Sequence, residues 1–170
     1  MKINIESLKL KIRPVSKNEL DAILNVYRQC EDFLALGPVS TASKEMVMQD
    51  LAFSEQAGGV FCGIHDDNGK MIGVLDYVPG HFEGDPGCAF LELLMIASPA
   101  RKQGIGKAVV EAFENEIRKN KDITSIRSGV QVNNPDAIKF WLGCGFRIVS
   151  GPTLMPDQTT VYGLQKDIHN

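Results

Sequence analysis

The sequence of 170 residues has no long hydrophobic run and no excess of positive charge. No stretch approaches the roughly 18 apolar residues that are needed to span a bilayer. The first residues lack the apolar core of a secretory signal, so we expect a cytoplasmic protein that does not bind membranes. The formal net charge of -3 argues against a general nucleic-acid-binding protein, because such proteins usually present a net basic surface.

Cysteine is also scarce, and its four residues stand far apart in the chain, at Cys30, Cys62, Cys88 and Cys144. They form no Cys-x-x-Cys pair and have no histidine at metal-ligand spacing, so we expect reduced, mostly buried thiols and no metal site. Internal repeats and low-complexity segments are absent too. With 44% hydrophobic and 23% charged residues, the composition is that of a globular protein, and the length suits one domain over residues 1–170.

The sequence does contain a basic, glycine-bearing turn, residues 101–107, between two regular elements. The apolar run 89–97 before the turn predicts a strand, and apolar positions from Ile105 to Ile117 repeat at helical spacing after it. The first N–H groups of a helix have no intrahelical partner and carry partial positive charge, and glycines let an anion approach the backbone. The turn therefore indicates a phosphate-binding site.

Spacing separates three kinds of phosphate loop. A Walker loop requires glycine where Arg101 stands and Ser or Thr where Ala108 stands, and a dinucleotide-binding loop requires a third glycine at Val109. The remaining pattern, Arg-x-x-Gly-x-Gly, matches Arg101, Gly104 and Gly106. In this pattern the turn resembles the acetyl-coenzyme-A-binding motif of the GNAT superfamily of N-acetyltransferases. For so short a pattern, the alternative is a helix that merely begins after a loop.

A second segment strengthens the resemblance. Residues 132–146 are similar to the family's Asn-x-x-Ala-x-x-Phe-Tyr-x-x-x-Gly-Phe pattern, with matches at Asn134, Ala137, Phe140, Gly145 and Phe146. Two separate motifs in the correct order and spacing occur by chance far less often than either motif alone.

Sequence patterns predict the order strand, two helices, three antiparallel strands, helix, strand, helix and two strands, with a hairpin turn at 66–69. The predicted strands span 8–13, 60–64, 71–78, 89–97, 126–132, 146–149 and 160–165, and the predicted helices span 16–34, 42–56, 105–117 and 135–141. The predicted fold class is therefore α/β (α+β). The resemblance implies a mixed, mostly antiparallel sheet of about seven strands flanked by about four helices, splayed between the fourth and fifth strands.

The resemblance also implies transfer of an acetyl group from acetyl-CoA to a primary amine of a small molecule or peptide, by direct attack in a ternary complex. The pyrophosphate of the cosubstrate would lie on the backbone N–H groups of residues 103–107, and its pantetheine arm would pair with the end of strand 89–97. The residues expected to bind acetyl-CoA are Leu94, Met95, Ile96, Arg101, Lys102, Gln103, Gly104, Ile105, Gly106, Lys107, Asn134, Ala137, Phe140 and Trp141.

Two residues are hypotheses for the chemistry itself. Glu92 is the acidic residue in an otherwise apolar strand, where burial would raise its pKa toward that of a general base. A solvent-facing or ion-paired Glu92 is an equal alternative, because a bulge in this strand would reverse the direction of its side chains. Tyr162 in the last strand is a further candidate for acceptor binding or proton transfer, although a structural role is the commoner reading.

Trp141 stands where most family members have a tyrosine that can protonate the departing thiolate. An indole N–H donates a hydrogen bond but is not a practical proton donor, so Trp141 either lines the cofactor channel or is an ordinary core aromatic. This departure keeps a second function open, a non-catalytic acyl-CoA binding or sensing module with the same fold.

No sequence motif identifies the acceptor or its binding site. The loop 79–87, with His81, Glu83 and Asp85, would attract a cationic amine, although a solvated loop is the commoner reading. The oligomeric state is open as well, with a homodimer among the alternatives.

Overall fold

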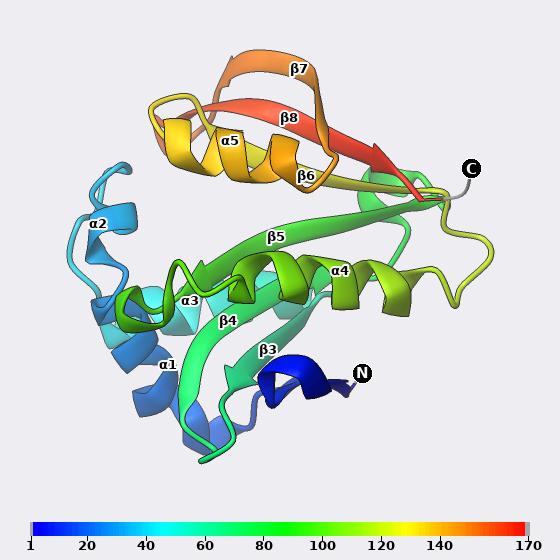
Figure 1. Ribbon diagram of the computed structural model, residues 1–170. Helices are drawn as coiled ribbons and strands as arrows, with labels where there is room; N and C mark the ends of the chain where they lie inside the picture. Colours follow the sequence, from blue (N-terminus) through cyan, green and yellow to red (C-terminus); the bar gives the residue numbers. More distant parts are fainter. Residues whose placement is uncertain (1, 169–170) are drawn as a thin grey trace.

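The computed structural model describes residues 2–168 and shows a mixed sheet of eight strands with helices on both faces (Figure 1). The strands are β1 (Ile3–Ile5), β2 (Leu10–Pro14), β3 (Val60–His65), β4 (Met71–Val78), β5 (Cys88–Ile96), β6 (Ser125–Gln131), β7 (Arg147–Leu154) and β8 (Thr160–Asp167). They lie in the order β1-β2-β3-β4-β5-β6-β8-β7 across the sheet. The helices are α1 (Leu20–Arg28), α2 (Glu31–Leu34), α3 (Lys44–Gln56), α4 (Ile105–Ile117) and α5 (Pro135–Gly143).

The sheet is antiparallel except where β5 pairs with β6. Their described pairs run only from Cys88 opposite Ser125 to Leu91 opposite Ser128. Beyond Leu91 the two strands diverge, as Figure 1 shows. This divergence is the predicted splay between strands 89–97 and 126–132, and the mixed α/β fold class is confirmed.

A β-bulge in β5 changes the direction of its side chains. Leu91 pairs with Tyr77 of β4, whereas Leu93 pairs with the preceding residue, Asp76, so Glu92 between them has no pairing partner in β4. In a regular strand Leu91 and Leu93 would share a face. Instead, Leu91 packs in the core with α4, and Leu93 packs in the core with α1 and α3.

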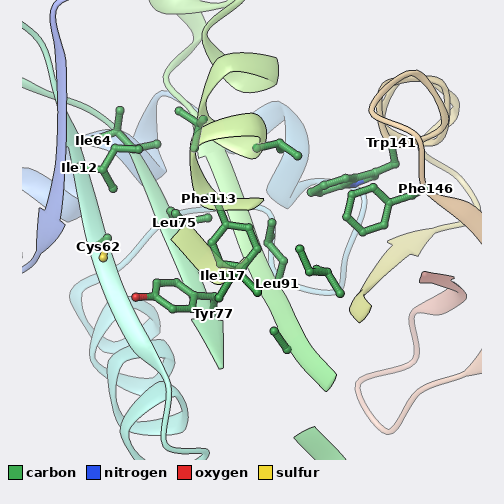
Figure 2. Packing of buried hydrophobic residues seen from close by; sticks show 14 of the residues in the cluster. Ile12, Cys62, Ile64, Leu75, Tyr77, Leu91, Phe113, Ile117, Trp141 and Phe146 are labelled. Carbon is green, nitrogen blue, oxygen red and sulfur yellow. The ribbon is translucent and has the colours of Figure 1, made fainter. Parts of the chain in front are cut away.

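The larger hydrophobic core lies between the sheet and helices α4 and α5 (Figure 2). Phe113 of α4 is fully buried, and its ring centroid lies 5.1 Å from that of Tyr77 on β4. Figure 2 shows Trp141 and Phe146 side by side at the α5 end of this core. Because each large buried apolar side chain contributes about 1.5–3 kcal/mol, this packing holds α4 against the sheet.

The second core lies on the opposite face, beneath α1 and α3, where Ile23, Tyr27 and Val47 are buried. The Tyr27 hydroxyl donates a hydrogen bond of 2.6 Å to the carboxylate of Asp50 on α3. This contact links the two helices and satisfies a polar group that the sheet and both helices surround.

Most of the predicted elements are present, with differences that have physical causes. The predicted helix 16–34 is divided, because the Gln29 carbonyl accepts a hydrogen bond from the Ser98 N–H instead of continuing the helical ladder. The capping box of Ser16 and Glu19 is present, within a 3-10 helix that precedes α1. Strand β1 was not predicted, since three residues are too short for a readable alternation. The structure thus has eight strands and five α-helices among its described residues, where about seven and four were expected.

Candidate functional site

A large groove opens at the splay, with a cavity volume of about 1710 Å³. Residues from β5, the loop before α4, α5 and β8 line it. Of the residues that the sequence analysis expected at the cofactor site, all line this groove except Gln103, whose side-chain amide donates to the Pro99 carbonyl at 3.2 Å. Glu92 and Tyr162 line it as well, so the structure brings nearly the whole predicted set together.

The loop before α4 presents backbone donors to the groove. Gly104 adopts a left-handed conformation with φ of 77°, and α4 begins at the next residue. Lys102 also has a positive φ, 61°. The N–H groups of the first helical turn have no intrahelical partner, and the helix dipole adds partial positive charge there. The exposed Lys102 and Lys107 add full charges, so this end of the groove suits an anion.

The two sequence motifs meet at Gly106. A Cβ atom at this position would lie 3.2 Å from Cε2 of Phe140 on α5, closer than ordinary van der Waals contact. Glycine here lets the beginning of α4 approach α5. The close approach of these two helices therefore gives one physical reason for Gly106 in the first motif and Phe140 in the second.

Three predicted ligands have partners within the protein. Asn134 caps α5, since its side-chain oxygen accepts from the Ala137 N–H at 3.0 Å. Trp141 is only 7% exposed, and its ring makes edge contacts with Phe140 and Phe146 at 5.1 Å. Trp141 is thus both a core aromatic and part of the groove wall, which combines the two alternatives left open by the sequence.

Arg101 is the third of these residues. Its Nε donates to the Ile96 carbonyl at 2.7 Å, and both terminal nitrogens bind the carboxylate of Asp32 in α2. This guanidinium also lowers the pKa of Asp32. Much of the hydrogen-bonding capacity of Arg101 is therefore directed at α2.

Glu92 projects from the bulge into the groove, where water reaches its side chain. The surrounding protein raises the pKa of this carboxyl, and the carboxylates of Asp76 and Asp50 raise it further by repulsion. Asp76 is buried and accepts a hydrogen bond of 2.6 Å from the Ser54 hydroxyl. A carboxyl with a raised pKa in an accessible groove is suited to take up a proton.

Tyr162 lies opposite Val130 of β6 and packs against the core with α4 and α5. It therefore lines the groove on the α5 side, whereas Glu92 interacts with carboxylates on the α1 and α3 side. Within the loop 79–87, Glu83 lines the groove, while Asp85 accepts from the Gly87 N–H at 3.0 Å and stabilises the loop.

Three segments without a motif complete the groove, from α2 to Leu36, from Phe82 to Phe90, and at 155–159. The rings of Phe82 and Phe90 stack with centroids 3.9 Å apart. At the end of β6, the side-chain oxygen of Gln131 is buried and has no hydrogen-bond partner among the described residues. The sequence had pointed to the loop 79–87 through its charged residues, whereas no motif marked the other two segments, which the fold alone brings to the groove.

The described residues contain no group of three or more His, Cys, Asp or Glu that could hold a metal ion. Within the same part of the chain, no helix has the length and apolar character needed to cross a membrane. The free cysteines Cys30, Cys62 and Cys88 are buried.

The sequence profile of the Acetyltransferase (GNAT) family matches residues 20–146, three quarters of the chain and the whole of the groove's two motifs. The chain belongs to the GNAT acetyltransferase family. The resemblance inferred from the two motifs is thereby confirmed. A comparison with curated proteins gave no match.

Solved structures of acetyltransferases share the fold. An acetyltransferase from Thermus thermophilus is 21% identical, with a TM-score of 0.79 over 98% of this chain and 99% of that one. Spermidine N-acetyltransferase from Vibrio cholerae, in complex with CoA and spermine, is 14% identical, with a TM-score of 0.72 over 94% and 95%. Ribosomal-protein-alanine N-acetyltransferase from Brucella melitensis is 23% identical, with a TM-score of 0.66 over 92% and 98%.

The residues of the groove fit the acetyl-CoA that GNAT enzymes use. The first turn of α4 offers donors to a diphosphate, and Gly106 lets this turn lie against Phe140 of the groove wall. On the other side, β5 beyond Leu91 has no described pairing with β6, so its edge is available to an extended arm. Leu94, Met95 and Ile96 lie on this edge and line the groove.

Proposed function

We propose that this GNAT protein transfers an acetyl group from acetyl-CoA to a primary amine of a small molecule or peptide, by direct attack in a ternary complex. One observation carries the proposal: a single groove joins an anion-binding helix start to a carboxyl with a raised pKa. Acetyl-CoA, when bound, supplies the activated acetyl thioester. Amine acceptors agree with the relatives, one of which is a spermidine N-acetyltransferase and another a ribosomal-protein-alanine N-acetyltransferase.

Binding of acetyl-CoA is assigned to backbone groups and two lysines. The N–H groups of residues 103–107 hold the diphosphate, and Lys102 and Lys107 add attraction from the exposed rim. The unpaired edge of β5 at Leu94 and Ile96 aligns the arm that carries the thioester. Phe140 and Trp141 form the opposite wall and exclude water from it.

Glu92 is the proposed general base. The attacking amine must be neutral, and as its new bond to the acetyl carbon forms and the carbon–sulfur bond breaks, one amine proton passes to the Glu92 carboxylate, directly or through water. Coenzyme A leaves as a thiolate, which water protonates, because a thiol with a pKa of ~8.5 is a tolerable leaving group. Trp141 shapes the wall beside the leaving sulfur and does not donate the proton.

The test is release of free thiol from acetyl-CoA in the presence of a panel of amines, comprising polyamines, amino acids and peptides with a free N-terminus. An acetyltransferase should release thiol with at least one class and give an acetylated product of matching mass. Silence with every amine would contradict the proposal.

A second function, a non-catalytic acyl-CoA binding or sensing module, is favoured by one observation, the buried Trp141 in the position of the usual tyrosine. The same assay separates the two functions. A sensor should bind acetyl-CoA in titration calorimetry and leave the thioester intact with all amines.

A further inference from the structure

We propose that Arg101 and Asp32 are positioning residues that hold one wall of the acceptor site against the acetyl-CoA loop. This acceptor wall comprises residues 31–37, which contain α2. The inference rests on the proposed function and reassigns the arginine of the Arg-x-x-Gly-x-Gly motif, which was expected to bind acetyl-CoA. In this chain the fork of its guanidinium faces the acceptor wall.

The geometry of Arg101 supports this role. Nε is occupied by the Ile96 carbonyl at 2.7 Å, which fixes the plane of the guanidinium at the end of β5. Nη1 and Nη2 each bind one oxygen of the Asp32 carboxylate, the second at 3.1 Å. Three hydrogen bonds fix the orientation of the Arg101 guanidinium. The negative charge of the Asp32 carboxylate would repel a diphosphate bound to the same nitrogens.

The far end of the acceptor wall is attached to the opposite side of the splay. The Asn133 side-chain amide, just beyond β6, donates to the Leu36 carbonyl at 3.0 Å. A Cβ atom built on Gly37 would make ordinary contact, at 3.6 Å, with Nε2 of Gln131. Figure 1 shows α2 at the open end of the splay, between α5 and the loop before α4. The acceptor wall therefore bridges the two diverging strands, with Arg101 holding one end.

Other contacts anchor the segment just before the wall. The Cys30 thiol donates to the Ile96 carbonyl at 3.4 Å, and the Ser98 N–H donates to the Gln29 carbonyl at 3.2 Å. The Ile96 carbonyl also accepts from Arg101 Nε, but the hydrogen bond between Ser98 and Gln29 involves neither Arg101 nor Asp32. Loss of the Arg101–Asp32 pair should thus loosen the acceptor wall without unfolding α1 or the sheet, so variants at these positions are expected to remain folded.

The proposal separates the effects on the two substrates. The side chains of the pair are partly exposed, 33% for Arg101 and 63% for Asp32, so each substitution should change affinity by roughly two- to fivefold, as expected for an exposed pair with good geometry. That change should appear in the KM of the acceptor, because the wall touches the acceptor. The Kd of coenzyme A should depend on the backbone N–H donors and on Lys102, and not on the Arg101–Asp32 pair.

The experiment compares Asp32→Asn, Arg101→Gln and the control Lys102→Ala. Asp32→Asn and Arg101→Gln should each raise the acceptor KM about two- to fivefold at unchanged kcat, while coenzyme A Kd, measured by calorimetry, changes by less than this. Lys102→Ala should show the opposite pattern, with weaker coenzyme A binding and an unchanged acceptor KM.

The result that would overturn the proposal is equally specific. If Arg101→Gln weakens coenzyme A binding at least as much as Lys102→Ala does, and Asp32→Asn leaves the acceptor KM unchanged, Arg101 is a phosphate ligand.

Hydrogen exchange tests the positioning role without turnover. In the ligand-free protein, Arg101→Gln and Asp32→Asn should speed amide exchange within residues 31–37, whereas Lys102→Ala should not. Unchanged exchange in both variants would refute the role of the pair. Failure of every amine in the panel would refute the proposed acetyl transfer while leaving the exchange result to stand on its own.

Discussion

The two sides of the groove are built in different ways. The acetyl-CoA side is continuous in sequence, from Arg101 to Lys107, and works through backbone N–H groups and through a glycine that lets α4 approach Phe140. The side proposed for the acceptor comes from three distant segments, 31–37, 82–90 and 155–159, and presents side chains. A ligand shared by a whole family can be held by backbone geometry, whereas the acceptor must be selected by side chains that vary.

The largest expected effect lies on Glu92, the proposed general base between these sides. Glu92→Gln should lower kcat/KM for the amine by roughly 100- to 10,000-fold, the usual contribution of a general base, and leave coenzyme A binding unchanged. Steady-state kinetics and calorimetry measure the two effects. The control Glu55→Gln, an exposed residue of α3, should change neither. Equal activity of Glu92→Gln and wild type would remove Glu92 from the chemistry.

The pH profile sharpens this prediction. Because the pKa of Glu92 is raised above its usual value of 4.5, the base should be lost as the pH falls through that raised pKa, and kcat/KM should fall with it. At higher pH the Glu92 carboxylate stays ionised, and its own contribution to the pH dependence ends. In Glu92→Gln this fall of kcat/KM at low pH should be missing. If both proteins lose activity over the same pH range, the loss belongs to another titrating group.

Gly106→Val should give the next largest effect. This substitution should weaken the binding of coenzyme A on the acetyl-CoA side of the groove. A side chain at this position would collide with Phe140 and displace the beginning of α4, so coenzyme A should bind on the order of 100-fold more weakly, a loss of about 2.7 kcal/mol. Calorimetry measures the loss. Gly143→Ala is the matched control, since a Cβ atom there meets nothing within 4 Å. Normal binding by Gly106→Val would separate the motif from the coenzyme.

Much of the fold could be predicted from the sequence because amphipathic helices and apolar strands have clear periods. The acetyl-CoA side was predictable for a related reason, since Gly104 and Gly106 occupy positions where backbone conformation or close contact restricts the residue. The direction of Glu92 could not be predicted, because it depends on a bulge set by the pairing of β5 with β4. The role of Arg101 was hidden too, since its partner Asp32 lies 69 positions away in the chain.

Trp141→Phe should separate packing from chemistry on the acetyl-CoA side. The smaller ring should cost about 1–2 kcal/mol of the free energy of unfolding, because Trp141 packs between Phe140 and Phe146. The value of kcat should stay within about threefold of wild type, since the indole transfers no proton. Denaturant unfolding and steady-state kinetics provide both values. A loss of kcat comparable to that of Glu92→Gln would give Trp141 a catalytic role.

The smallest effect should fall far from both sides of the groove, at Glu19. Arg13 binds this carboxylate with two hydrogen bonds of 2.7 and 2.8 Å and lowers its pKa to about 2, with further help from Ser16. A lowered folded-state pKa stabilises the protein above the usual value of 4.5, and that stability is lost as the pH falls toward 2.

Wild type should therefore lose about 1 kcal/mol more than Glu19→Gln over this range, the modest size expected for a partly screened pair. Urea unfolding at several pH values checks the difference. Coenzyme A binding should be the same in both proteins at neutral pH, and parallel pH curves for unfolding would remove Glu19 from the acid sensitivity.

The most direct test of the central proposal is thiol release from acetyl-CoA with the amine panel, run with wild type and Glu92→Gln side by side. The account predicts that wild type releases thiol in step with an acetylated amine, and that Glu92→Gln binds coenzyme A normally yet releases little. Tight coenzyme A binding by wild type with no thiol release for any amine would contradict it.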